Sequence, residues 1–284
     1  MQEVAAALAA LAARAIGVWT RPERLGTLAT IALVLVLWAC VLRLSRGTWP
    51  SPDRDDGTDA LYTAFYVGGF FSFLVGAPLY ALVSHGVHAF TPALELHLLR
   101  GTPGWLQFFV LTAVTDFVSY WWHRWAHASR LLWRFHRIHH SQPHLTPLTN
   151  YRFHAGDMTL RGTLQAVPVV MLGADASWFL AAIWFETALN LLAHSDLDWG
   201  YGQAGYLVVS PRFHRVHHAA GAGPAHRNYG FLLAVWDFAF GTAADGTDRP
   251  EKFGVEGEIV PRSFLAQQVD PFLGLRRARS GAAP

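Results

Sequence analysis

The chain has 284 residues, of which 52% are hydrophobic and 15% are charged, with a formal net charge of +2. Because about a quarter of the residues in soluble domains are charged, this composition favours a membrane protein, and the small, scattered positive charge argues against nucleic-acid binding. The single cysteine, Cys40, excludes a disulfide framework and a cysteine-ligated zinc site.

The N-terminal part of the sequence predicts two membrane-spanning helices. Residues 1–20 are rich in alanine and are expected to form an interfacial helix, and residues 25–42 form an uncharged apolar run. Such a run is long enough to cross about 30 Å of hydrocarbon at about 1.5 Å per residue. Residues 60–94 lack Asp, Glu, Lys and Arg, and a second span is expected at 61–83. We therefore interpret residues 1–104 as a membrane-anchoring region.

Three further apolar segments follow in the central part of the chain. Residues 105–122 are expected to span the membrane and lead directly into a histidine-rich stretch. Residues 158–173 and 177–194 flank a short turn and predict a helical hairpin that dips into the membrane and returns. The expected fold is therefore an all-α integral membrane protein. Residues 105–245 form its predicted central domain and residues 246–284 a C-terminal tail.

Histidine spacing is the most informative feature of the sequence. Two histidines after the third predicted span are spaced i, i+4, and three more follow at i, i+3, i+4. The segment RFHRIHH at 134–140 recurs as RFHRVHH at 212–218. On helices each set would line up on one face and direct its imidazoles to a common point, which is a geometry for binding a metal.

With a lone histidine that ends the predicted hairpin, nine histidines are expected at one edge of the helical core. Nine ligands exceed the needs of one ion and suit two metal ions with four or five ligands each, with positions left open for catalysis. Imidazole suits iron, zinc, copper and nickel, so the ligand type alone leaves the metal open. The candidate ligands are His123, His127, His136, His139, His140, His194, His214, His217 and His218.

The order of these histidine motifs resembles that of the fatty acid hydroxylase and sterol desaturase superfamily, whose members are integral-membrane enzymes with a non-haem di-iron centre. The shared order is HxxxH, HxxHH, a lone histidine and a final HxxHH. The resemblance covers about residues 108–242. It includes a DFxxYWxHRxxH run that ends at His127, NYG at 228–230 and WDxxFGT at 236–242.

The resemblance implies a transmembrane helical core with a cytoplasmic histidine-rich helical cap, two non-haem iron ions, O2 as co-substrate and a membrane lipid as substrate. Arginine placement agrees with this sidedness, because residues 123–161 and 195–284 hold fifteen of the 22 Lys and Arg residues. The sequence contains no flavin fingerprint, iron–sulfur motif or fused cytochrome. Electrons are therefore expected from an external donor, a reductase with a cytochrome or ferredoxin.

The sequence departs from the family pattern at Asn190, where some members have a further histidine. His154, with Asp157 three residues later, is a candidate for the missing ligand or for a hydrogen-bonding partner of a ligand. Asp116 and Glu186 are acids in apolar segments on the same helical faces as histidines. Each is expected either to bond a neighbouring helix or to support a ligand.

The expected activity is that of an O2-dependent di-iron hydroxylase acting on a fatty acyl, sterol or related membrane lipid. A lipid desaturase of the same superfamily is the first alternative, since no residue discriminates the two reactions. A non-redox membrane protein whose histidines bind zinc is the second. Iron content and O2 consumption separate the zinc protein from the two oxidases.

Overall fold

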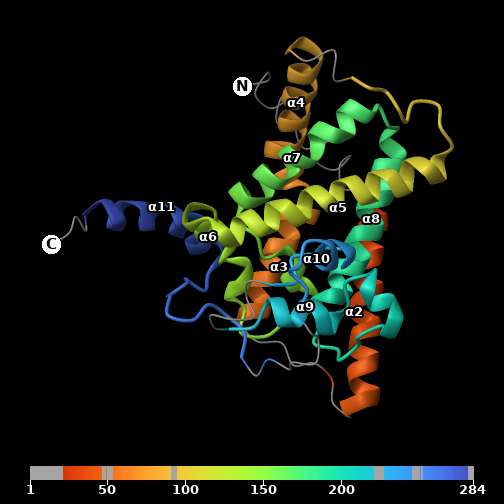
Figure 1. Cartoon of the computed structure of the whole chain (residues 1–284). Coiled ribbons are helices and arrows are strands. Elements are labelled where there is room, and N and C mark those ends of the chain that lie inside the picture. The colour runs from red at the N-terminus through yellow and green to blue at the C-terminus, as the bar shows by residue number, and fades with distance from the viewer. Residues whose placement is uncertain are drawn as a thin grey trace, which may run out of the picture.

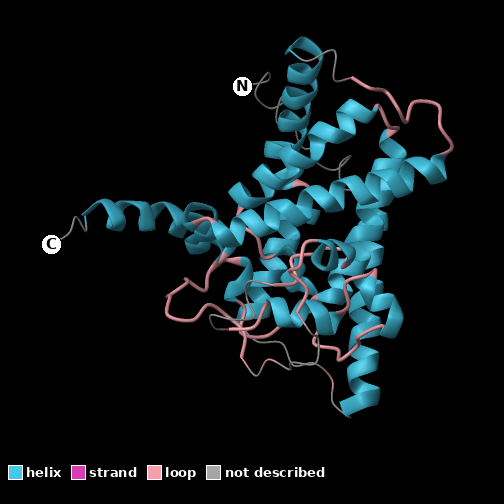
Figure 2. Cartoon of the chain, viewed as in Figure 1, coloured by secondary structure: helices cyan, strands magenta, loops and turns pink. Residues whose placement is uncertain are grey.

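The computed structural model describes residues 22–46, 49, 54–90, 95–220, 227–244, 250 and 252–280. The interfacial helix expected at 1–20 lies outside these ranges. Within them, helices are joined by loops, and β structure is limited to two isolated bridges, Val208 with Leu233 and Ala219 with Phe253 (Figure 2). The predicted all-α class is therefore confirmed for the described part of the chain.

The first two expected spans differ in how they fold. Helix α2 (Pro22–Arg46) covers the whole first apolar run and packs against α8 (Ala176–Ala193). The prediction of one helix over 61–83 is wrong, because α3 (Arg54–Val67) ends at a bend. Gly69 adopts a φ of 86° there, a conformation that glycine tolerates without steric cost. A π-helical turn (Ser72–Gly76) and α4 (Ala77–Phe90) follow the bend.

Helices α5, α7 and α8 form the centre of the molecule (Figure 1). The long α5 (Gly104–Ala128) contacts both α7 (Ala155–Leu172) and α8. The two helices expected on either side of the turn are present as α7 and α8, but α7 packs mainly on α4 and α5, and α8 mainly on α5 and α2. Leu111 of α5 is buried with Val169 of α7 and Ala182 of α8, so the apolar faces of the three helices enclose a shared core.

The remaining described elements are mostly short. These are α6 (Arg130–His136), the 3-10 turns His139–Ser141, Pro147–Tyr151 and Gly202–Tyr206, α9 (Pro211–His217), α10 (Val235–Ala239) and α11 (Phe264–Ser280). Serine side chains cap the N-termini of α6 and α9. Ser129 Oγ accepts from Leu132 N at 3.4 Å, and Ser210 Oγ accepts from Phe213 N at 3.2 Å. Such caps satisfy a backbone N–H at a helix start and favour helices at these positions.

Helix α3 is bound tightly to the histidine-rich region. Ile138, which lies between histidines of the first triple, is fully buried against Tyr62 and Tyr66 of α3. Asp59 of α3 pairs with Arg152, and both side chains are buried. The N-terminal region therefore contributes directly to the position of the first histidine triple, beyond its expected role as an anchor.

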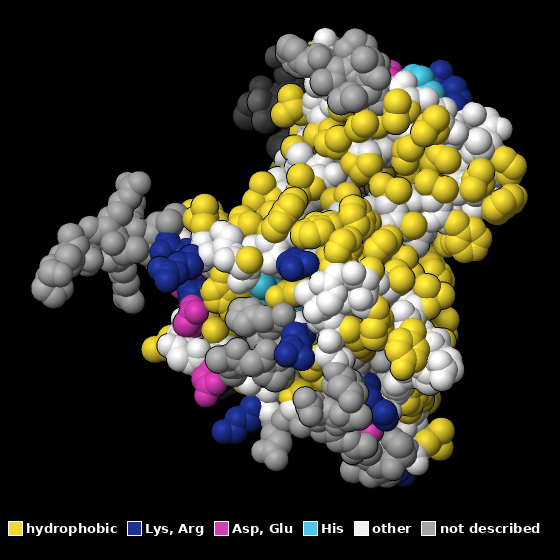
Figure 3. All heavy atoms as spheres, in the orientation of Figure 1, with side chains coloured by type: hydrophobic (Ala, Val, Ile, Leu, Met, Phe, Trp, Pro, Cys, Tyr) yellow, Lys and Arg dark blue, Asp and Glu magenta, His cyan; other side chains and the backbone are white. Residues whose placement is uncertain are grey.

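The part of the chain that the structure describes contains no helix with both the length and the apolar character required to cross a membrane. Large hydrophobic side chains are nevertheless exposed along several helices, including Leu33 and Leu37 of α2, Leu82 of α4, and Trp105 and Phe109 of α5. Figure 3 shows apolar side chains gathered over the half of this face that contains α4, α5 and α7.

Candidate metal centre

The structure brings all nine predicted histidines together in two adjacent groups. One ring nitrogen from each member lies within 4.8 Å of those of the other members of its group. All nine side chains are buried. The five-histidine group consists of His123, His127, His136, His140 and His217, and the four-histidine group of His139, His194, His214 and His218.

The two HxxHH triples do not each converge on one point, as their spacing had suggested. In the first triple, His136 and His140 belong to the five-histidine group, whereas His139 belongs to the four-histidine group. In the second triple, His214 and His218 belong to the four-histidine group, whereas His217 belongs to the five-histidine group. Neighbouring residues of a helix point about 100° apart, because a turn holds about 3.6 residues. The i and i+4 members therefore share a direction that the i+3 member does not.

Outward hydrogen bonds orient four of the histidine rings. The Nδ1 atoms of His123, His194 and His217 donate to the backbone carbonyls of Tyr229, Asn190 and Arg227 at 2.7, 2.8 and 2.8 Å. His136 Nδ1 donates to the Asp157 carboxylate at 2.8 Å. Because a carbonyl oxygen can only accept, Nδ1 carries the proton in the first three rings. Their Nε2 lone pairs therefore face the interior of the groups, as metal-binding histidines require.

The inward nitrogens lie close to one another. His194 Nε2 is 3.0 Å from His214 Nε2 and 3.3 Å from His139 Nε2, and His217 Nε2 is 3.2 Å from His140 Nε2. In the five-histidine group, the buried Nε2 atoms of His123 and His136 have no hydrogen-bond partner among the described residues. Buried lone pairs without donors are costly. A cation in each group would satisfy them, so the residues fit a metal pair.

Burial also determines the protonation of these rings. It lowers the pKa of His194 to about 4. Burial, and then the neighbouring histidines, place the pKa of five further rings well below the ordinary value; these are His123, His139, His140, His214 and His218. These imidazoles are therefore neutral at neutral pH, which is the state that binds metals.

Two acids fix the loop that supports His123. Asp237 accepts from the backbone N–H groups of Tyr229 and Gly230 at 2.8 and 2.7 Å. Asp116 accepts from Leu232 N at 2.8 Å and also from Leu233 N and Trp236 Nε1. Asp116 thus contacts no histidine directly, and it holds the segment whose Tyr229 carbonyl orients His123. A Cβ at position 230 would lie 2.7 Å from Leu233 O, which explains the glycine of the NYG motif.

The remaining candidates take different positions. His154 lies outside both groups, and its ring nitrogens bond Gln268 O and Gly156 N at 2.9 and 2.8 Å, so it caps α7. Asn190 contributes its backbone carbonyl to His194, while its side-chain N–H bonds Glu186 O. Glu186 contacts neither histidine group and lines a cavity between helices. Asp157 is the candidate that bonds a histidine through its side chain.

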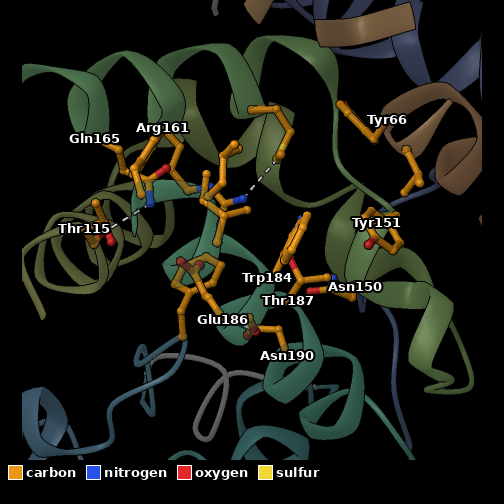
Figure 4. Close-up of a pocket in the computed structure, with 16 residues that line it drawn as sticks. Tyr66, Thr115, Asn150, Tyr151, Arg161, Gln165, Trp184, Glu186, Thr187 and Asn190 are labelled. Atoms are coloured by element: carbon orange, nitrogen blue, oxygen red, sulfur yellow. Dashed lines mark hydrogen bonds between the residues drawn. The ribbon is translucent and has the colours of Figure 1, made fainter. Parts of the chain in front are cut away.

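This cavity has a volume of about 490 Å³ and lies between α3, α5, α7 and α8 (Figure 4). It lies beside both histidine groups, although none of the nine histidines is among its lining residues. Phe231 lines it, and the Phe231 ring lies 4.9 Å from the His123 ring. Asn190 also lines it and accepts the hydrogen bond from His194. A molecule in the cavity would therefore lie next to the candidate metal centre.

Sequence reasoning did not identify the roles of Asp237, Tyr229 and Phe153. The Phe153 ring stacks on His139 with ring centres 4.0 Å apart, and its carbonyl accepts from Tyr66 OH at 2.8 Å. Asp237 and Tyr229 stand within the NYG and WDxxFGT motifs, so the family pattern had marked them without indicating a role. Nothing in the local sequence marks Phe153.

The comparisons with known proteins agree with the geometry. The model of the family described as fatty acid hydroxylase matches residues 108–242. The ornithine lipid hydroxylase OlsE of Rhizobium tropici is 30% identical over 260 residues, which are 89% of this chain and 76% of that protein. No solved structure matches the chain.

Two further kinds of relative match a smaller part of this chain. The alkylglycerol monooxygenase of Danio rerio is 30% identical over 145 residues, which are 51% of this chain and 31% of that protein. The very-long-chain aldehyde decarbonylase GL1-6 of Oryza sativa subsp. indica is 27% identical over 185 residues, which are 60% and 28% of the two chains. The first relative matches most of both chains, and the family model matches residues 108–242. The chain therefore belongs to the fatty acid hydroxylase family.

Proposed function

We propose that this protein is an O2-dependent di-iron hydroxylase that inserts one oxygen atom into a membrane lipid. The observation that carries the proposal is the division of nine buried histidines into adjacent groups of five and four beside a cavity. Family membership supports iron as the metal in both groups. Two bound iron ions would activate O2 and supply the oxidant that an unactivated C–H bond requires, because no side chain supplies one.

The side chains of this protein hold and shield that centre. The carbonyls of Tyr229, Asn190 and Arg227 keep three rings in the metal-binding tautomer. Phe231 and Phe153 cover His123 and His139 on the side of α7. These rings exclude water from the space between the centre and the cavity, which protects a reactive oxidant from side reactions.

A lipid substrate agrees with both the relatives and the cavity. The relatives include an ornithine lipid hydroxylase and an alkylglycerol monooxygenase. Apolar residues of α8, such as Phe179, Leu180 and Ile183, line one wall of the cavity. Such a wall suits an acyl or alkyl chain, because burial of apolar surface drives binding.

We place the protein in the membrane as a multi-pass protein with the histidine groups on the cytoplasmic side. The exposed apolar side chains of α2, α4 and α5 support contact with lipid, since monomeric soluble proteins seldom expose large apolar patches. The basic residues of 123–161 and 195–284 support the cytoplasmic orientation. The electrons would come from an external reductase with a cytochrome or ferredoxin.

The decisive experiment is turnover of extracted membrane lipids under ¹⁸O2 by the purified, iron-loaded protein with a reductase system. Hydroxylation requires one labelled oxygen in the lipid, with the other oxygen released as water. Loss of two hydrogens without label would identify a desaturase. Zinc in place of iron, together with no O2 consumption, would refute both oxidative reactions.

A further inference from the structure

The cavity beside the histidine groups contains polar side chains that have no adequate partner within the described part of the protein. The only hydrogen bond of the Arg161 guanidinium there is to Met158 Sδ at 3.3 Å, and a thioether is a weak acceptor. The Glu186 carboxylate accepts no hydrogen bond from a described residue, and the buried Asn190 Oδ1 and Tyr151 OH atoms also lack partners. A purely apolar ligand would leave all four groups unsatisfied.

Arg161 and Glu186 enter the cavity from different helices without pairing. In Figure 4, Arg161 extends from α7 on one side, and Glu186 and Asn190 extend from α8 on the other. Arg161 and Glu186 interact electrostatically, but no ion pair joins them in the described part of the chain. Buried charges are costly unless they are paired. A ligand with complementary charges would satisfy both groups at once.

Arg161 is also close to the candidate metal centre. Its guanidinium carbon lies 4.7 Å from the centre of the Phe231 ring and 5.4 Å from that of Phe153. The same two rings also contact His123 and His139, one from each histidine group. Arg161 and each histidine group therefore contact a common aromatic ring. A polar group bound by Arg161 would lie near the oxidised position.

We propose that the cavity is a head-group site for a zwitterionic lipid, in which Arg161 binds the anionic group and Glu186, assisted by Asn190 Oδ1, binds an ammonium group. This inference rests on the proposed lipid hydroxylation and specifies its substrate class. The lipid chain extends from the head group along the apolar wall of α8. The oxidised carbon then lies in the head group or within the first few bonds of the chain, and not near the chain terminus.

Binding tests this proposal without turnover. The full-length purified protein is titrated, by displacement of a fluorescent lysophospholipid, with three oleoyl lipids. Lysophosphatidylethanolamine carries a phosphate and an ammonium group, lysophosphatidylglycerol only the phosphate, and monooleoylglycerol neither. We expect affinity to fall in that order, with at least a tenfold difference between the first and the last. Equal affinity for the three lipids would overturn the head-group site while leaving the ¹⁸O2 result unaffected.

Two variants separate the roles of the charged residues. Arg161→Gln should reduce lysophosphatidylglycerol to the affinity of monooleoylglycerol, which itself should stay unchanged, and should leave lysophosphatidylethanolamine only the contribution of its ammonium group. Glu186→Gln should remove only the preference for lysophosphatidylethanolamine over lysophosphatidylglycerol. Arg130→Gln and Glu256→Gln, at exposed positions outside the cavity, are matched controls that should change nothing. A loss of affinity for all three lipids alike would contradict the assignment.

A second variant at Arg161 and a ligand without an acyl chain complete the test. If Arg161→Gln does not fold, Arg161→Lys keeps the charge and should keep the preference for phospholipids over monooleoylglycerol, and loss of that preference would count against the proposal. Glycerophosphoethanolamine has the head group of the first lipid without its chain. It should bind at least tenfold more weakly than the lipid. Equal affinity would identify a soluble occupant and overturn the lipid part of the proposal.

Discussion

Asp157 accepts a hydrogen bond of 2.8 Å from His136 Nδ1, and the two side chains are at most 1% exposed. The second carboxylate oxygen accepts from Trp122 Nε1 at 2.7 Å. Asp157 lies in the first turn of α7, where the N-terminal end of the helix dipole stabilises a negative charge. One carboxylate thus connects α5, α6 and α7 and directs Nε2 of His136 into the five-histidine group.

Asp157→Asn should weaken iron binding in the five-histidine group by about 10–100-fold, the usual effect of losing a carboxylate partner of a metal-binding histidine. An asparagine keeps the shape but removes the negative charge that raises the basicity of His136. The measurement is iron per chain after dialysis against graded chelator, with Glu256→Gln as an exposed control. Iron retention equal to that of the control would show that Asp157 does not support a metal ligand.

Paired histidine variants test the division into two groups. His139→Ala with His214→Ala removes two members of the four-histidine group, and we expect about half of the iron to remain. His139→Ala with His217→Ala removes the i+3 histidine of both triples. This pair therefore removes one member from each group. We expect this pair to lower the iron content further. If the two pairs lose iron equally, the groups are not separate binding sites.

Acid should destabilise the metal-free protein. Burial lowers the pKa of His194 from 6.5 to about 4 in the folded protein, so between these values the unfolded chain binds more protons. The free energy of unfolding therefore decreases as the pH falls from 6.5 towards 4. The stability that the neutral His194 contributes is fully present above pH 6.5.

Thermal unfolding of the metal-free protein in detergent at pH 7.5 and 5.5 checks this prediction. We expect the midpoint to fall by at least about 2–4 °C, which corresponds to roughly 1 kcal/mol for a chain of this size. The exposed variant His85→Asn is the control and should show the same pH dependence as the wild type. A midpoint that does not change between the two pH values would contradict the buried, neutral state of the histidines.

The ion pair between Asp59 and Arg152 should be essential for the stability of the histidine region. Asp59 also accepts from Gln142 Nε2 and Thr149 Oγ1 at 3.0 and 3.1 Å, so α3 is joined to the segment after the first triple. Burial raises the pKa of Asp59 to about 6, although Arg152 acts in the opposite direction. Without Arg152, the buried carboxylate would have no opposite charge beside it.

Arg152→Met should therefore lower the free energy of unfolding by about 3–5 kcal/mol, the usual loss when one partner of a buried pair is removed. The double variant Arg152→Met with Asp59→Leu should recover part of this loss, because it leaves no buried charge. Denaturant unfolding in detergent measures both changes. A single variant within about 0.5 kcal/mol of the wild type, as expected for a surface substitution such as Arg130→Gln, would contradict the role of the pair.

Cysteine labelling tests the proposed orientation in the membrane. In a Cys40→Ser background, a cysteine at Pro143 follows the first histidine triple, and one at Arg100 precedes α5; both positions are exposed. Helix α5 has 25 residues, about 37 Å at 1.5 Å per residue, so the two positions lie on opposite sides in the proposed topology. An impermeant reagent should label intact cells at position 100 and should require permeabilisation at 143. Labelling of position 143 in intact cells would refute a cytoplasmic centre.

Sequence alone determined the helical class, the family and the nine histidines of the candidate centre. These features are local, because apolar runs indicate helices and short histidine spacings mark metal-binding residues wherever the chain later folds. Helices α7 and α8 were predicted for the same reason, since two apolar segments flank a short turn. The bend at Gly69, within a run without charged residues, escaped this local analysis.

Tertiary structure decided which histidines lie in the same group and what orients them. His139 and His217 hold the same position in a repeated motif, yet they lie in different groups. Asn190 acts on His194 through its backbone carbonyl, which no side-chain pattern encodes. The separation of Arg161 from Glu186 across the cavity depends on how α7 and α8 pack against α3 and α5. Such relationships arise from contacts between distant segments, so no local sequence pattern contains them.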